Sequence, residues 1–110
     1  MDKIWEAREG GLVVIVFYVT WCGPCKGIAW QIERMATIHY TDVIFTKVDT
    51  DVSEDIAREY KITALPTFIF VKDGVKVDEL MGANREQLEK RINKHKSRNI
   101  SLNYYLFNTK

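Results

Sequence analysis

An apolar segment that runs directly into two closely spaced cysteines constrains the fold of this chain more than any other feature. Residues 12–19, LVVIVFYV, are apolar without alternation and rich in β-branched side chains. A strand that is apolar on both faces lies at the centre of a covered sheet, which favours parallel pairing. WCGPCK follows at 21–26, and apolar residues then recur at helical spacing to His39. The sequence predicts a central strand that leads into a helix over 22–39, with both cysteines at the helix start.

Strand-like and helical segments alternate along the remainder of the chain. The first two strands are joined by a helix and are expected to be parallel, whereas the last two form an antiparallel hairpin across Asp73-Gly74. The sequence is therefore that of one α/β domain with a mixed sheet and helices on both faces. The further strands are expected at 43–48, 67–71 and 75–80, and the further helices at 2–9, after Asp51 and after Asn84.

Two pairs of residues resemble capping boxes at helix starts, Asp51 with Glu54 and Asn84 with Gln87. The helical faces expected to point inward are Val52, Ile56, Ala57 and Tyr60 in one helix, and Leu88 and Ile92 in the last. Cations crowd the end of the last helix, where they suit the helix dipole, and we interpret them as a solvated helix end. These cations are Lys90, Arg91, Lys94, His95, Lys96 and Arg98.

Composition excludes several classes of function. The 110 residues carry a net charge of +1, so no global field attracts nucleic acid or acidic lipid. The longest apolar run, 12–19, is far shorter than the ~20 residues of a membrane-spanning helix. The charged N-terminus has no apolar signal region, so we expect a cytoplasmic protein. In that compartment, two cysteines are more often catalytic or metal-binding than a permanent disulfide.

Cys22 and Cys25 are spaced to close a small, reversible disulfide at a helix N-terminus, where unpaired N–H groups favour thiolate. Cys22 precedes the helix body and is expected to be the exposed nucleophile, with Cys25 as the resolving thiol. A zinc site, a structural disulfide and two idle buried thiols are the alternatives. Zinc would need four ligands, and only His39 and His95 are at hand, at spacings that fit no finger.

The chain resembles thioredoxin in sequence and in spacing over about residues 12–97. The matching segments are WCGPCK at 21–26, KVDTD at 47–51, ALPTF at 64–68, KDG at 72–74, and Gly82. The resemblance implies the thioredoxin fold and reduction of protein disulfides. It also implies no bound cofactor, with electrons supplied by NADPH through thioredoxin reductase. Partners would then be that reductase and disulfide-containing proteins.

The resemblance also assigns roles to individual residues. Cys22 carries over as nucleophile and Cys25 as resolving thiol, and Gly23 and Pro24 as the spacer that keeps the couple reducing. The substrate-facing residues that carry over are Trp21, Leu65, Pro66 and Gly82. Pro66 is expected to be cis, which would free the Leu65 backbone to pair with an extended substrate strand.

Two positions depart from the family pattern near the cysteines. Val16 stands where family members usually carry a buried Asp that helps take the proton from the resolving thiol. Lys47, which normally lies near that Asp, has lost its partner and is expected to be neutral, displaced or extended toward solvent. We hypothesise that Cys25 resolves mixed disulfides more slowly at neutral pH. Trp30 replaces a helix-kinking Pro, which predicts a straighter helix.

The two ends of the chain also depart from the pattern. Residues 1–98 are expected to form an abbreviated thioredoxin domain with four strands, its first edge strand missing or replaced, and 99–110 a C-terminal extension. Strand 43–48 would then be an exposed edge. The tail alternates in period two. It is expected either to pair with that edge, in the same chain or in a neighbour, or to be disordered or extend the last helix. A monomer is expected, with a dimer through the edge or the tail as the alternative. The match of Asn99-Ile100-Ser101 to a glycosylation acceptor is interpreted as chance.

Three functions fit these residues. The first is a protein-disulfide reductase in electron transport and cell redox homeostasis. The second is a binding module that holds partners in the Trp21–Pro66 groove, which Val16 and the short N-terminus favour. The third is an isomerase-like domain, against which the Gly-Pro between the cysteines argues. A redox titration separates the first from the third.

Overall fold

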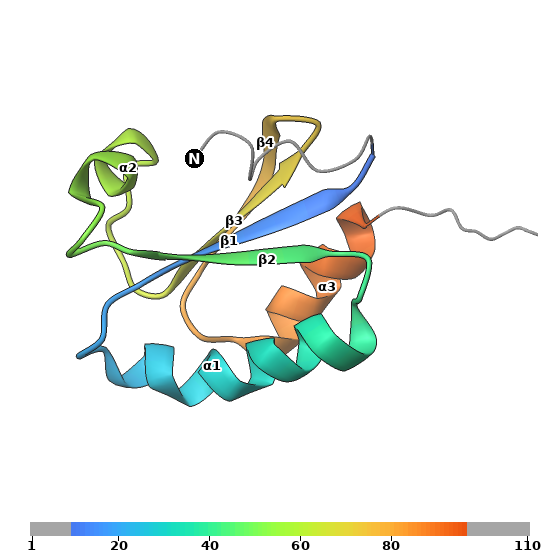
Figure 1. Ribbon diagram of the computed structural model, residues 1–110, viewed down its shortest axis with the longest axis horizontal. Helices are drawn as coiled ribbons and strands as arrows, with labels where there is room; N and C mark the ends of the chain where they lie inside the picture. The colour runs from blue at the N-terminus through green and yellow to red at the C-terminus, as the bar shows by residue number, and fades with distance from the viewer. Residues whose placement is uncertain (1–9, 97–110) are drawn as a thin grey trace, which may run out of the picture.

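Four strands form one mixed sheet in the computed structural model, which describes residues 10–96 (Figure 1). The strand order is β2-β1-β3-β4, with β1 parallel to β2 and antiparallel to β3, and β3 antiparallel to β4. This confirms the predicted mixed sheet and its four strands. The strands are β1 (Leu12–Tyr18), β2 (Ile44–Asp49), β3 (Thr67–Lys72) and β4 (Val75–Met81).

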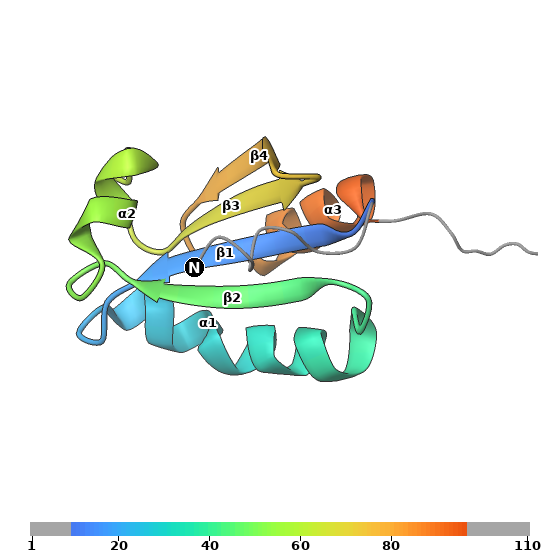
Figure 2. The same cartoon turned by 45° about the horizontal axis from the view of Figure 1, so that its top comes forward.

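Helices cover both faces of the sheet, as the sequence predicts. Helices α1 (Gly23–Arg34) and α3 (Arg85–His95) lie on one face, and α2 (Glu54–Glu59) lies on the other (Figures 1 and 2). The alternation of β1 explains this division, because its even-numbered residues pack with α1 and α3 and its odd-numbered residues pack with α2. Leu88 and Ile92 are fully buried in the first layer, as expected.

The end of the first long helix differs from the prediction. A π-helix, η2 (Met35–His39), continues α1 without a break. Each π turn holds more residues than an α turn, so the buried face shifts along the sequence. Tyr40 is buried, and His39, expected on the inward face, is exposed. Trp30 lies within α1, and the straighter helix expected from its replacement of Pro stays a prediction.

The start of α2 also differs from the prediction. Ser53, not Asp51, is the N-cap residue, and its side chain makes no capping hydrogen bond. The Asp51 backbone N–H instead donates to Asp49 Oδ1 at 2.9 Å. Val52 therefore lies in the turn before the helix and is 80% exposed, contrary to expectation.

The hairpin and the last helix cap follow the sequence signals. Asp73 and Gly74 both have positive φ, 53° and 77°, as a two-residue hairpin turn of the primed type requires. Asn84 is the N-cap of α3, and its Oδ1 accepts from the Gln87 backbone N–H at 3.1 Å. Both predictions are confirmed.

The basic end of α3 is only partly solvated. His95 Nε2 lies 2.9 Å from Asp78 Oδ2, and Arg91 Nε donates to Asp78 Oδ1 at 3.4 Å. Two of the cations therefore attach α3 to β4, and the interpretation of all of them as a solvated helix end was wrong for these two. Sequence spacing could not show this, because Asp78 comes from a distant strand.

The sheet edge at β2 pairs with β1 alone over the part of the chain that the structure describes. Three expectations fall on residues outside the described range. They are the helix at 2–9, the C-terminal extension at 99–110 and the glycosylation motif at Asn99. Within residues 10–96, no helix has the length and apolar character needed to cross a membrane.

Candidate redox site

The two cysteines lie where β1 ends and α1 begins. Cys22 is the N-cap residue of α1 with extended backbone dihedrals, and Pro24 occupies the first turn, where its missing N–H costs no hydrogen bond. Cys22 Sγ accepts from the Cys25 backbone N–H at 3.1 Å. The sulfur thus lies at the positive end of the helix dipole, where a thiolate is stabilised.

Cys22 and Cys25 form a disulfide, with their Cα atoms 5.2 Å apart. Their exposed fractions are 7% and 6%, so the expectation of an exposed Cys22 is not met in this oxidised state. Both sulfurs pack in a small cluster with Val19, against which Tyr18 and Leu65 lie. The spacer residues Gly23 and Pro24 are exposed beside them.

Trp21 projects from the loop before α1 and is 71% exposed. Its indole N–H donates to Asp51 Oδ2 at 3.0 Å, which joins this loop to the turn after β2. The sequence predicts a place for Trp21 at the rim, whereas for Asp51 it predicts only a helix cap. The shared segment KVDTD at 47–51 was the available signal for a role of Asp51 near the cysteines.

The other rim residues come from the loops that flank β3 and β4. The Leu65–Pro66 peptide bond is cis, as the resemblance implies. The Gly82 backbone N–H donates to the Pro66 carbonyl at 2.8 Å, so the two expected rim residues are directly bonded. Pro66 is buried, while Leu65 and Gly82 are half-buried.

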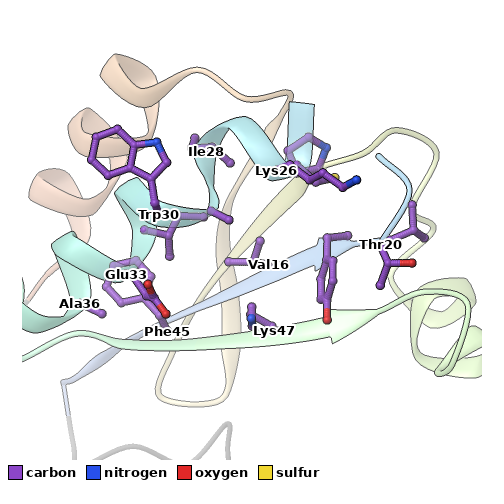
Figure 3. Close-up of a pocket in the computed structure, with 15 residues that line it drawn as sticks. Val16, Thr20, Lys26, Ile28, Trp30, Glu33, Ala36, Phe45 and Lys47 are labelled. Atoms are coloured by element: carbon purple, nitrogen blue, oxygen red, sulfur yellow. The ribbon is translucent and has the colours of Figure 1, made fainter. Parts of the chain in front are cut away.

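A cavity of about 590 Å³ lies between α1 and the neighbouring strands (Figure 3). Val16 of β1 forms part of its wall, as do Cys25 from α1 and the rim residue Pro66, so the cavity adjoins the redox site. Most of its lining is apolar, and its charged residues are Lys26, Glu33 and Lys47. The lining residues are Val16, Tyr18, Val19, Thr20, Cys25, Lys26, Ile28, Ala29, Trp30, Ile32, Glu33, Ala36, Phe45, Lys47 and Pro66.

Val16 and Lys47 are register partners in the parallel pair β1–β2. Val16 is 4% exposed and belongs to the apolar core. Lys47 is exposed, and its Nζ lies 5.6 Å from the centroid of the Tyr18 ring. Lys47 was expected to be neutral, displaced or extended toward solvent, and in the structure it extends toward solvent. A cation–π contact with Tyr18 takes the place of a carboxylate partner.

No group of three or more potential metal ligands occurs among residues 10–96. His39 is exposed at the end of η2, and His95 contacts Asp78 on the far side of α3. The structure brings neither histidine to the cysteines.

A disulfide between two cysteines at a strand–helix junction of a mixed sheet defines a redox-active α/β protein. Comparison with known proteins identifies the family. The family model described as Thioredoxin matches residues 3–94, and the chain belongs to the thioredoxin family. Thioredoxin H2-1 of Oryza sativa subsp. japonica is 40% identical over 102 residues, covering 91% of this chain and 73% of the relative. A thioredoxin of Coprinus comatus is 44% identical over 88 residues, covering 79% of this chain and 83% of the relative.

Solved structures agree with this assignment. The Fasciola hepatica thioredoxin superposes with a TM-score of 0.78 at 45% identity, over 80% of this chain and 84% of that one. A thioredoxin from Nicotiana alata gives 0.80 at 41% identity, over 84% and 79%. The family and the Cys22–Cys25 disulfide together make this chain a protein thiol–disulfide oxidoreductase.

Proposed function

We propose that the chain works as a reductase of protein disulfides in which Cys22 is the nucleophile and Cys25 the resolving thiol. The observation that carries this assignment is the position of Cys22 as the N-cap of α1, with its sulfur accepting the Cys25 backbone N–H. Cys25 lies within the first turn and is held among apolar side chains, an environment that favours its thiol form. Gly23 and Pro24 set the spacing of the pair.

The reaction proceeds by two thiol–disulfide exchanges. The Cys22 thiolate attacks one sulfur of the substrate disulfide, forms a mixed disulfide and releases the other substrate sulfur as a thiolate, which takes a proton from water. Cys25 then gives up its proton to water and attacks Cys22 Sγ, which releases the second substrate sulfur as a thiolate that takes a proton from water in turn. Two electrons pass to the substrate, and the protein is left with the Cys22–Cys25 disulfide.

Substrate would dock across the rim made by Trp21, Leu65, Pro66 and Gly82. The large exposed indole of Trp21 supplies apolar contact area. Because its hydrogen bond to Asp51 already restricts its orientation, the indole loses less conformational entropy when substrate binds. The Leu65 backbone, next to the cysteine cluster, would pair with an extended segment of the substrate.

The electrons that restore the dithiol would come from NADPH through thioredoxin reductase, in the cytoplasm, with the chain acting as a monomer. Membership of the thioredoxin family supports this donor. Residues 1–98 would form the working domain. Val16 and Lys47 would tune the second exchange, since Val16 supplies no carboxylate to the cavity that Cys25 also lines.

A binding module with weak redox activity is the second candidate, and the apolar Val16, which lines the same cavity as Cys25, is the observation that favours it. Reduction of insulin by dithiothreitol distinguishes the two candidates. We expect catalysis by the wild-type protein, its loss in Cys22→Ser, and a stable mixed disulfide with substrate in Cys25→Ser. A folded wild-type protein without turnover would overturn the reductase and favour the binding module.

A further inference from the structure

We propose that the cavity between α1 and β2 binds a small carboxylic acid with an apolar body, of the class of medium-chain fatty acids. Its volume of about 590 Å³ lies within the range of small-molecule sites. This cavity shares Pro66 with the rim but does not include Trp21, and the proposal does not depend on the direction of the redox reaction.

The wall of the cavity suits an apolar body. Val16, Ile28 and Ile32 are buried core residues that line the cavity, and the partly buried Phe45 lines it from β2. Val16, Ile28 and Phe45 are labelled in Figure 3. Apolar ligand atoms would move from water to this apolar wall, and no polar group would lose its hydrogen bonds in the process.

The charges around the cavity favour an anionic head group. Lys26 and Lys47 both contribute to the lining, and within residues 10–96 neither ammonium has a carboxylate within 4.0 Å. Glu33 is the acidic residue of the lining, and in Figure 3 it lies on the opposite side of Val16 from Lys26. A carboxylate bound beside Val16 would therefore pair with Lys47, its register partner on β2.

Calorimetric titration of the oxidised full chain with decanoate and with 1-decanol tests the proposal. We expect one decanoate per chain, and about fivefold weaker binding of the uncharged alcohol, the effect of one solvent-accessible ion pair. Lys47→Met should weaken decanoate about fivefold and leave decanol unchanged. Lys90→Met, which removes an exposed cation of α3, is the matched control and should bind both ligands as the wild type does.

A second pair of variants tests the location. Ala29 lines the cavity, and Ala29→Phe should abolish binding of both ligands by filling it. Arg34→Phe adds the same ring to an exposed position of α1 outside the cavity and should leave binding unchanged. Circular dichroism establishes that each variant is folded. Absence of decanoate binding to the wild type, equal binding of acid and alcohol, or full binding by Ala29→Phe would each overturn the proposal.

Discussion

The indole N–H of Trp21 bonds the carboxylate of Asp51, 30 residues further along the chain, at 3.0 Å. The backbone N–H of Asp51 is held separately by Asp49 Oδ1, so the turn after β2 keeps a local hydrogen bond when the Asp51 side chain is removed. The carboxylate therefore acts on the orientation of Trp21 more than on the fold.

Asp51→Ala tests this relationship. We expect a change of less than about 1 kcal/mol in the free energy of unfolding, because the bond is exposed. The kcat/KM for insulin should fall about two- to fivefold, because binding must then order a freer indole. In a Trp21→Phe background, which lacks the donor, Asp51→Ala should have no further effect on kcat/KM. An equal loss in both backgrounds would show that Asp51 acts by another route.

Val16→Asp tests whether the apolar residue that lines the same cavity as Cys25 limits the second exchange. A carboxylate there could accept the Cys25 proton, so turnover near pH 7 should increase and the mixed disulfide should be shorter-lived in single-turnover experiments. Burial of the new carboxylate should lower the free energy of unfolding by about 1–3 kcal/mol in urea titrations. Val16→Asn is the matched control and should lose stability without gaining turnover. No gain in turnover at any pH would refute the hypothesis.

The sequence predicts the parts of this fold whose signals are local. The β-branched segment of β1, the Asp73-Gly74 turn and the Asn84 cap each need only a few adjacent residues to specify them. The cysteine pair is equally local, which is why its position at the start of α1 follows from spacing alone.

The features that were missed depend on tertiary contacts. Tyr40, rather than His39, enters the core because a π turn shifts the end of the helix by one position. Asp51 forms a hydrogen bond with Trp21 across a sequence separation of 30 residues, and Asp78 with His95 across 17. At such separations the periodicity of helices and strands does not predict which side chains meet. The cavity beside Val16 likewise arises from the gap between α1 and β2 and has no signature in the sequence.

Asn84→Ala tests the cap of α3. The side chain accepts the Gln87 backbone N–H at 3.1 Å, and its loss leaves that donor without a protein partner. We expect a loss of about 1 kcal/mol in the free energy of unfolding, measured by urea denaturation. Asn93→Ala, at an exposed position in the last turn of the same helix, is the control and should be neutral or slightly stabilising. Equal effects of the two variants would show that the cap contributes nothing specific.

The contacts of Asp78 with α3 predict a pH-dependent contribution to stability. Burial raises the pKa of this carboxyl, but the hydrogen bonds from His95 and from the Glu79 backbone, with the charge of Arg91, outweigh it. The pKa of Asp78 in the folded protein is therefore lowered from its ordinary value of 3.8. The unfolded chain binds the proton more readily, so the stabilisation is complete above the unfolded pKa and is lost as the pH falls through the folded one.

Asp78→Asn removes this contribution and is measured by urea denaturation at a series of pH values. Near pH 6 the wild type should be more stable than the variant by about 1 kcal/mol, and the difference should shrink progressively below about pH 5. Asp55→Asn, at an exposed position of α2, is the control that corrects for the general effect of removing one negative charge. A difference between wild type and Asp78→Asn that stays constant down to the acid unfolding transition would show that Asp78 holds α3 through packing alone.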